Sequence, residues 1–120
     1  IRTVVGDNLG IAIHDARAVH QRGPEAVAAD LRARVGGRPV YLSFDIDALD
    51  PAFAPGTGTP VWGGLSSAQA AQILRGLAGI NLVGGDVVEV SPPFDHAAIT
   101  AVAAAHVAME LICLWGWCRR

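Results

Sequence analysis

Residues 41–51 read YLSFDIDALDP, an apolar run that ends in three carboxylates within six residues. An extended segment sends side chains i and i+2 to the same side, so Asp45 and Asp47 share one direction if the strand continues that far. Carboxylates held together repel one another unless a cation neutralises them, and such oxygen ligands suit Mg²⁺ or Mn²⁺. The stretch therefore predicts a divalent metal site. The alternative is a solvated aspartate turn closed by Asp50-Pro51.

A helix and a strand precede these carboxylates. Pro24 suits the first position of a helix, and Gly36-Gly37 provides the stop. Residues 39–44 then form a mostly apolar strand, typical of a parallel sheet that is buried on both faces. Before the helix, residues 11–14 form a short apolar-rich run, which we interpret as another strand.

A long loop and a second helix follow the carboxylates. Residues 51–64 are rich in Gly, Pro and Thr, which predicts an irregular segment that can approach a ligand closely. Ser66 and Gln69 have the spacing of a capping box at the start of a helix. Gly79 closes that helix.

The last strand and helix set the fold class. Residues 82–90 predict the strand, and residues from about 97 to 115 predict an Ala-rich, nearly all-apolar helix with Asp95 as its N-cap. Strands that alternate with helices in this way are typical of an α/β fold with a mainly parallel sheet. Ligands of such sheets bind beyond the carboxyl ends of the strands, where both Asp45 and Glu89 lie.

Glu89 stands between Val88 and Val90, where a core strand favours another apolar residue. Burying its carboxylate without a partner is costly, so we expect it to face a cation or a polar pocket. A structural salt bridge is the alternative. Asp86, earlier in the same strand, has the same two interpretations and is the weaker candidate.

Composition and charge exclude several classes of protein. The chain has 120 residues and a formal net charge of −2, so nucleic-acid binding, which rests on clustered basic residues, is not expected. No secretory leader is recognisable, which favours a cytoplasmic location. The last helix is long enough to cross a membrane, but His106 and Glu110 fall in its middle, so we expect no membrane span.

Several blocks together resemble the ureohydrolase family, which contains the arginases, agmatinases and guanidinobutyrases. They are SFDIDALDP at 43–51, APGTGTP at 54–60, GGL at 63–65 and DVVEVSPP at 86–93. Blocks in this order are a specific signature, and the resemblance extends from about residue 20 to residue 114. The last block and the residues after it resemble the agmatinase branch more than arginase proper.

The resemblance implies a fold and a reaction. The fold is a three-layer α-β-α sandwich with a mainly parallel sheet, of which this chain is the C-terminal part. In the family, two Mn²⁺ ions activate the hydroxide that attacks the guanidinium carbon of substrates such as agmatine or guanidinobutyrate, giving urea and an amine. By resemblance, Asp45 bridges the metals and Asp47 binds one of them. Glu89 holds the guanidinium and Thr59 lines the pocket, and the intact protein is expected to be a homo-oligomer.

The sequence departs from the family pattern in the other metal ligands. Those lie on an earlier His-bearing strand and an Asp-Ala-His-x-Asp run, and neither occurs in this chain. We therefore expect residues 1–120 to be the C-terminal portion of a single catalytic domain, without its N-terminal metal-binding half and weakly active alone. No catalytic residue is assigned. The histidines are interpreted as surface or structural residues: His14, His20, His96 and His106.

Two other functions are compatible with parts of the pattern. In the first alternative, the chain is an inactive fragment that serves only as an assembly or interaction module through its apolar last helix. A Mn²⁺-dependent glycosyltransferase also uses a strand that runs into Asp-x-Asp, here Asp45 and Asp47, to bind a nucleotide sugar. That second alternative gives no role to Glu89 or to the loop at 54–60.

Overall fold

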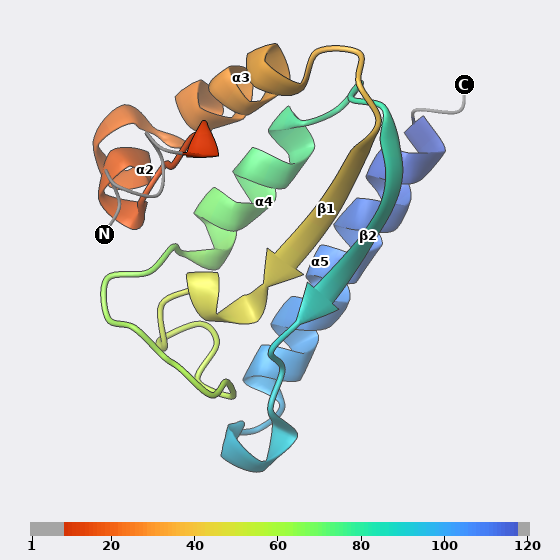
Figure 1. The fold of residues 1–120 in the computed structure, drawn as a ribbon. Coiled ribbons are helices and arrows are strands. Elements are labelled where there is room, and N and C mark those ends of the chain that lie inside the picture. The colour runs from red at the N-terminus through yellow and green to blue at the C-terminus, as the bar shows by residue number, and fades with distance from the viewer. Residues whose placement is uncertain (1–8, 118–120) are drawn as a thin grey trace.

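The computed structural model describes residues 9–117, which form helices and a two-stranded sheet (Figure 1). In chain order, the helices and strands are α2 (Ala16–Arg22), α3 (Pro24–Val35), β1 (Val40–Asp45), α4 (Ser67–Gly76), β2 (Leu82–Val88) and α5 (Ile99–Trp117). Two 3₁₀ turns, at Ile46–Ala48 and Pro92–Phe94, follow the strands.

Strands β1 and β2 lie side by side and run parallel, with α4 between them in sequence (Figure 1). Their register pairs Ser43 with Asp86 and Asp45 with Val88. The carboxyl ends of both strands therefore meet at one edge of the sheet, and Glu89 directly follows Val88 there. This edge is where ligands of parallel sheets bind.

Helices α4 and α5 cover one face of the sheet. The core cluster on that face contains Leu42, Phe44, Leu74, Val87, Val107 and Leu111. Gly85 permits the close packing, because a Cβ there would lie 2.7 Å from the Leu42 carbonyl oxygen and 3.4 Å from Leu111. The opposite face of β1, with Tyr41, Ser43 and Asp45, is exposed within the described residues. The described chain thus supplies the sheet and one helical layer.

Local signals predicted two helices correctly. Helix α3 begins at Pro24 and ends before Gly36, whose φ is 54°. The predicted capping box opens α4. The Ser66 hydroxyl accepts a hydrogen bond from the Gln69 amide at 3.1 Å, and the Gln69 side chain accepts one from the Ser66 amide at 3.0 Å.

The predicted strand over residues 11–14 is wrong. These residues form no regular element and pair with neither β1 nor β2. The next residues form α2, a helix that was not predicted. The Asp15 side chain caps it by accepting a hydrogen bond from the Ala18 amide at 2.9 Å.

Two boundaries differ from the prediction because the backbone turns left-handed. Strand β2 ends at Val88 and not at residue 90, since Glu89 has a φ of 65°. Helix α5 begins at Ile99 and not near residue 97, since Ala97 and Ala98 have φ values of 51° and 58°. Neither regular element continues through such residues.

Helix α5 is long and apolar enough to cross a membrane, judged by length and composition alone. In the structure one side of it packs against the core, with Val107, Leu111 and Leu114 buried, whereas Met109 and Ile112 are exposed. Its Glu110 forms an ion pair with Arg75 of α4. A core helix passes the same test of length and composition, so the absence of a membrane span stays our prediction.

Candidate metal and substrate site

Asp45 and Asp47 lie at the carboxyl end of β1, but not at alternate positions of one strand. The strand ends at Asp45, which caps the 3₁₀ turn Ile46–Ala48 by accepting a hydrogen bond from the Asp47 amide at 3.1 Å. Ile46 is fully buried in the core and anchors that turn. A tight, anchored turn therefore brings the two carboxylates together, in place of the strand alternation that we expected.

The surroundings of Asp45 disfavour its negative charge. Although Asp45 is exposed, partial desolvation raises the pKa of its carboxyl, and the hydrogen bond from the Asp47 amide only partly offsets this. The negative charges of Asp47 and Glu89 raise the pKa further. In residues 9–117, none of these three carboxylates forms an ion pair with an arginine or histidine. A cation placed among them would remove the repulsion.

Thr59 lies beside Asp47. Its hydroxyl donates a hydrogen bond to Oδ2 of Asp47 and thereby connects the long loop to the end of β1. Because one carboxylate oxygen is held, the direction of the other is fixed as well. Partners of this kind commonly orient carboxylates that bind metals.

Asp50 folds the loop back on itself. Its carboxylate accepts hydrogen bonds from the Ala52 amide at 2.9 Å and the Gly63 amide at 2.8 Å, and these bonds lower the pKa of Asp50. A Cβ on Gly64 would lie 2.5 Å from the Asp50 nitrogen, so the chain passes very close at this point. Asp50 is thus a turn residue.

Glu89 follows β2 and faces the same loop. It is exposed, because the strand ends one residue earlier, so its carboxylate is not buried between the two valines. Its φ of 65° is a left-handed conformation that costs a non-glycine residue about 1–2 kcal/mol. Oε2 of Glu89 lies 4.0 Å from the place of a Cβ on Gly58, so the glycine leaves room beside the carboxylate.

Asp86 lies apart from this group, on the exposed face of the sheet. Its two carboxylate oxygens accept hydrogen bonds from the Ser43 hydroxyl at 2.6 Å and the Tyr41 hydroxyl at 2.7 Å. These bonds lower the pKa of Asp86. Asp86 is therefore satisfied by hydrogen bonds between the two strands and needs neither a salt bridge nor a ligand.

The described residues fit part of a metal site. Asp45 and Asp47 offer oxygen ligands whose charge is not neutralised, which is the chemistry that Mn²⁺ prefers. Within residues 9–117, however, no three His, Cys, Asp or Glu side chains are arranged to hold a metal ion. The pair therefore fits Mn²⁺ as two members of a larger ligand set.

Two of the histidines have structural contacts. The His20 ring nitrogens lie 3.1 Å from the Gly63 carbonyl oxygen and 3.2 Å from the Gln69 side-chain nitrogen, so His20 connects α2 with the loop and α4. The His106 ring donates a hydrogen bond to the Val102 carbonyl oxygen at 2.9 Å within α5. Both contacts agree with the structural role expected of these residues.

Sequence reasoning missed two buried threonines that belong to this region. Thr57 is buried, and its hydroxyl has no hydrogen-bond partner in the described residues. Thr100 is fully buried, and its hydroxyl accepts a hydrogen bond from the Gly56 amide at 2.7 Å. The available signal for Thr100 was a hydroxyl within an apolar helix, because a buried hydroxyl needs a partner.

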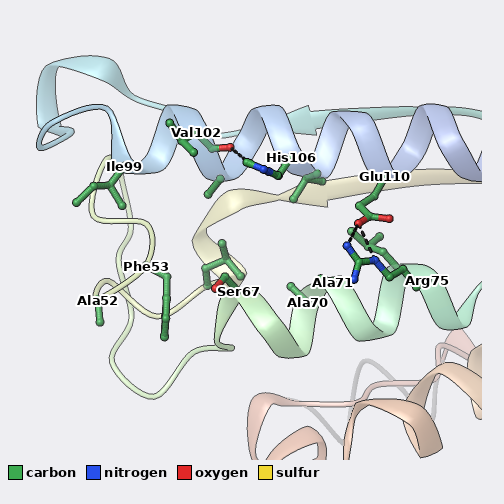
Figure 2. A pocket seen from close by; sticks show the side chains of 14 residues that line it. Ala52, Phe53, Ser67, Ala70, Ala71, Arg75, Ile99, Val102, His106 and Glu110 are labelled. Atoms are coloured by element: carbon green, nitrogen blue, oxygen red, sulfur yellow. Dashed lines mark hydrogen bonds and ion pairs between the residues drawn. The ribbon is translucent and has the colours of Figure 1, made fainter.

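A separate cavity of about 400 Å³ lies between α4 and α5 (Figure 2). Its wall is mostly apolar. The ion pair of Arg75 and Glu110 lies toward one end and Phe53 toward the other (Figure 2). None of the three clustered carboxylates lines this cavity, so it is distinct from the candidate site.

Comparison with known sequences gives a family match. The sequence model of the Arginase family matches residues 2–113. The chain is 52% identical over 114 residues to the agmatinase of Chromobacterium violaceum, a match that covers 95% of this chain and 35% of that protein. The chain thus spans about a third of the length of the curated relatives it matches.

Solved structures share the fold. A crystal structure from Burkholderia thailandensis, described as a hypothetical agmatinase, has a TM-score of 0.88 and 64% identity, and covers 91% of this chain and 35% of that chain. Proclavaminate amidino hydrolase from Streptomyces clavuligerus has a TM-score of 0.93 and 40% identity, and covers 97% of this chain and 38% of that chain. These similarities confirm the predicted arginase-like α/β fold.

Proposed function

The chain belongs to the arginase family, and on that premise we propose that its carboxylates form part of the active site of a manganese-dependent amidinohydrolase. The reaction releases urea from a guanidino compound such as agmatine or guanidinobutyrate. One observation carries the proposal. Asp45 and Asp47 share the turn after β1, Glu89 follows Val88 at the same edge of the sheet, and no arginine or histidine in residues 9–117 is paired with any of them. A metal ion and a cationic substrate together supply the compensating charge.

Asp45 and Asp47 are the residues of this chain that hold Mn²⁺ in the proposal. Asp45 would serve as a ligand of both ions and Asp47 as a ligand of one. The metal, when bound, supplies Lewis-acid activation of water. Thr59 keeps the Asp47 carboxylate oriented through the hydrogen bond from its hydroxyl.

Glu89 binds the guanidinium group of the substrate. A carboxylate pairs with a planar guanidinium through two parallel hydrogen bonds, which fix its orientation as well as its charge. Gly58 leaves space beside this carboxylate, and Thr59 follows Gly58 in the same loop. A substrate held rigidly in this way is oriented for attack by water.

The relatives favour agmatine as the substrate, since curated proteins that share 52% and 53% identity with the chain are named agmatinases. The full-length protein is further proposed to be a cytoplasmic homo-oligomer. A sugar-nucleotide transferase, in contrast, finds no support among these relatives.

Urea release with added Mn²⁺ tests the proposal. The chain is assayed alone with agmatine, guanidinobutyrate and arginine, and again as a chimaera in which it replaces the matching third of the Chromobacterium violaceum agmatinase. We expect little turnover by the chain alone and clear turnover of agmatine by the chimaera. Asp45→Asn is the matched control, because it keeps the size of the side chain and removes the charge.

Each result has a distinct meaning. If a folded chimaera releases no urea from any of the three compounds, the amidinohydrolase proposal fails and the inactive assembly module remains. Urea release that survives Asp45→Asn contradicts the metal role of Asp45. Turnover of guanidinobutyrate but not agmatine would contradict the proposed substrate and support the proposed reaction.

A further inference from the structure

Thr100 lies in the first turn of α5 and has no exposed surface. Its hydroxyl oxygen accepts the hydrogen bond from the Gly56 amide at 2.7 Å, across 44 positions of sequence. The Asp95 carboxylate holds the same turn by accepting hydrogen bonds from the amides of Thr100 and Ala101, both at 3.0 Å. Although desolvation alone raises the pKa of Asp95, these bonds hold it below its ordinary value. The start of α5 is thus a firm attachment point for the loop.

Gly56 is the point where three segments of the chain meet. Its amide bonds to Thr100 of α5, and its carbonyl oxygen accepts a hydrogen bond from the Ser91 amide at 2.8 Å. A Cβ at this position would lie 2.7 Å from the Cβ of Asp95, so glycine alone fits without movement. We call Gly56, Ser91 and Thr100 the Gly56 clamp.

The clamp holds both sides of the proposed guanidinium site. Ser91 lies two residues after Glu89, and Gly58 lies two residues after Gly56. Glu89 and Gly58 face each other, with Oε2 of Glu89 4.0 Å from the place of a Cβ on Gly58. Because Glu89 has a left-handed backbone, its conformation persists only where neighbouring contacts enforce it.

We propose that Thr100 is a positioning residue, which acts through Gly56 to hold Glu89 against the Gly58 segment at the separation that a guanidinium group needs. The identity of the ligand rests on the proposed function, whereas the clamp rests on two hydrogen bonds. Asp45 is held by a different device, the 3₁₀ turn anchored by buried Ile46, whereas Asp47 is bonded both to this turn and to Thr59 of the loop. The clamp should therefore affect metal binding much less than guanidinium binding.

Two variants of Thr100 test the clamp itself. Thr100→Val keeps the shape of the side chain and removes the hydroxyl, and Thr100→Ser keeps the hydroxyl. Hydrogen exchange of the Gly56 and Ser91 amides is measured by NMR. In the wild type we expect both amides to be protected relative to the exposed loop residue Trp62. Thr100→Val should accelerate exchange at both by about tenfold, the effect of one lost buried hydrogen bond, and Thr100→Ser should restore protection.

Ligand binding tests the positioning role. Agmatine and Mn²⁺ are titrated separately by calorimetry into the chimaera with the Chromobacterium violaceum agmatinase, which carries the wild-type chain or either variant. Thr100→Val should weaken agmatine binding by about tenfold and leave the Mn²⁺ affinity within about twofold. Thr100→Ser should recover agmatine binding. A residue that merely stabilised the fold would not separate the two ligands.

The results distinguish this inference from the proposed function. Equal agmatine affinity in the wild type and Thr100→Val overturns the positioning role and leaves the proposed function intact. Equal amide protection in those two proteins overturns the clamp. If the wild-type chimaera binds no agmatine, the proposed function fails, and the exchange data decide the clamp on their own. If Thr100→Val does not fold, rapid exchange of the Gly56 amide in the wild type overturns the clamp.

Discussion

The Thr59 hydroxyl donates a hydrogen bond to the Asp47 carboxylate, although twelve positions of sequence separate the two residues. The loop over residues 51–64 has no helix or strand, yet this bond and the two that Asp50 accepts hold it against the end of β1. A loop ordered in advance presents its side chains to a ligand without an entropic cost on binding. The direction of Asp47 therefore depends on a residue outside the proposed metal ligands.

Removal of the Thr59 hydroxyl should weaken metal binding. Thr59→Val keeps the shape of the side chain but releases Asp47, and we expect the Mn²⁺ affinity to fall about tenfold, as for other residues that orient metal ligands. Thr59→Ser keeps the hydroxyl and is the control. Titration of free Mn²⁺ by electron paramagnetic resonance gives both affinities. Equal affinities in the wild type and Thr59→Val would show that Asp47 is oriented without this bond.

Mn²⁺ should raise the Tm of the chain, because a ligand that binds only the native state stabilises it. At about one hundred times Kd the gain is about 2.7 kcal/mol. Chelation by EDTA should reverse the gain, and Asp45→Asn should lose most of it. Asp30→Asn is the control, since Asp30 pairs with Arg22 away from the site and should keep the gain. A wild-type Tm that Mn²⁺ does not change contradicts the prediction.

Without metal, the pH dependence of stability should report on Asp45. Partial desolvation and the neighbouring carboxylates raise its pKa in the folded chain. The stability linked to this group is therefore complete below the ordinary aspartate pKa of about 3.9 and is lost as the pH rises through the raised pKa. Urea denaturation in EDTA should show Asp45→Asn gaining stability over the wild type as the pH rises. A difference that does not vary with pH contradicts the raised pKa.

Tyr41 is the single tyrosine of the chain, so ultraviolet absorbance can follow its ionisation alone. Its hydrogen bond to Asp86, then desolvation and the Asp86 charge, raise its pKa above 10.0. This interaction therefore stabilises the fold below about pH 10 and is lost as the pH rises through the raised pKa. Asp86→Asn should bring the midpoint back toward the ordinary value. Ser43→Ala, which removes only the other donor to Asp86, should keep the midpoint raised.

Gly56→Ala should destabilise the chain. The added Cβ would lie 2.7 Å from the Cβ of Asp95, and overpacking of this kind costs about 1–3 kcal/mol. Gly37→Ala is the matched control, because nothing lies within 4 Å of its added Cβ, and its effect should stay within about 0.5 kcal/mol. Chemical denaturation measures both. Equal stability of the two variants would mean that the loop moves aside easily.

Helices whose signals are local were predicted well from the sequence. Pro24 marks the start of α3, and Ser66 and Gln69 form a capping box within one turn of α4. Strands depend on neighbours that local composition does not reveal, so the apolar run at 11–14 was interpreted wrongly. Strand β2 was predicted too long for a related reason. The backbone of Glu89 is left-handed, and the apolar residues on either side of it give no sequence signal for this conformation.

The candidate site was predictable where its chemistry is concentrated in sequence. Asp45 and Asp47 are recognisable in the sequence as two like charges, one residue apart, at the end of an apolar strand. The Gly56 clamp was not predictable, because the contact of Thr100 with Gly56 spans 44 positions and depends on how α5 lies against the loop.

Glu89 has both a strained backbone conformation and a proposed role in substrate binding, and two variants separate these properties. Glu89→Gly removes the carboxylate and relieves the left-handed backbone, whereas Glu89→Ala removes the carboxylate and keeps the strain. We expect Glu89→Gly to be the more stable of the two by about 0.5–1 kcal/mol. This difference is the relief of backbone strain minus the entropic cost of the greater freedom of glycine in the unfolded chain. Both should lose agmatine binding in calorimetric titration. Equal stabilities of the two variants would mean that the left-handed backbone at position 89 is not strained in the folded chain.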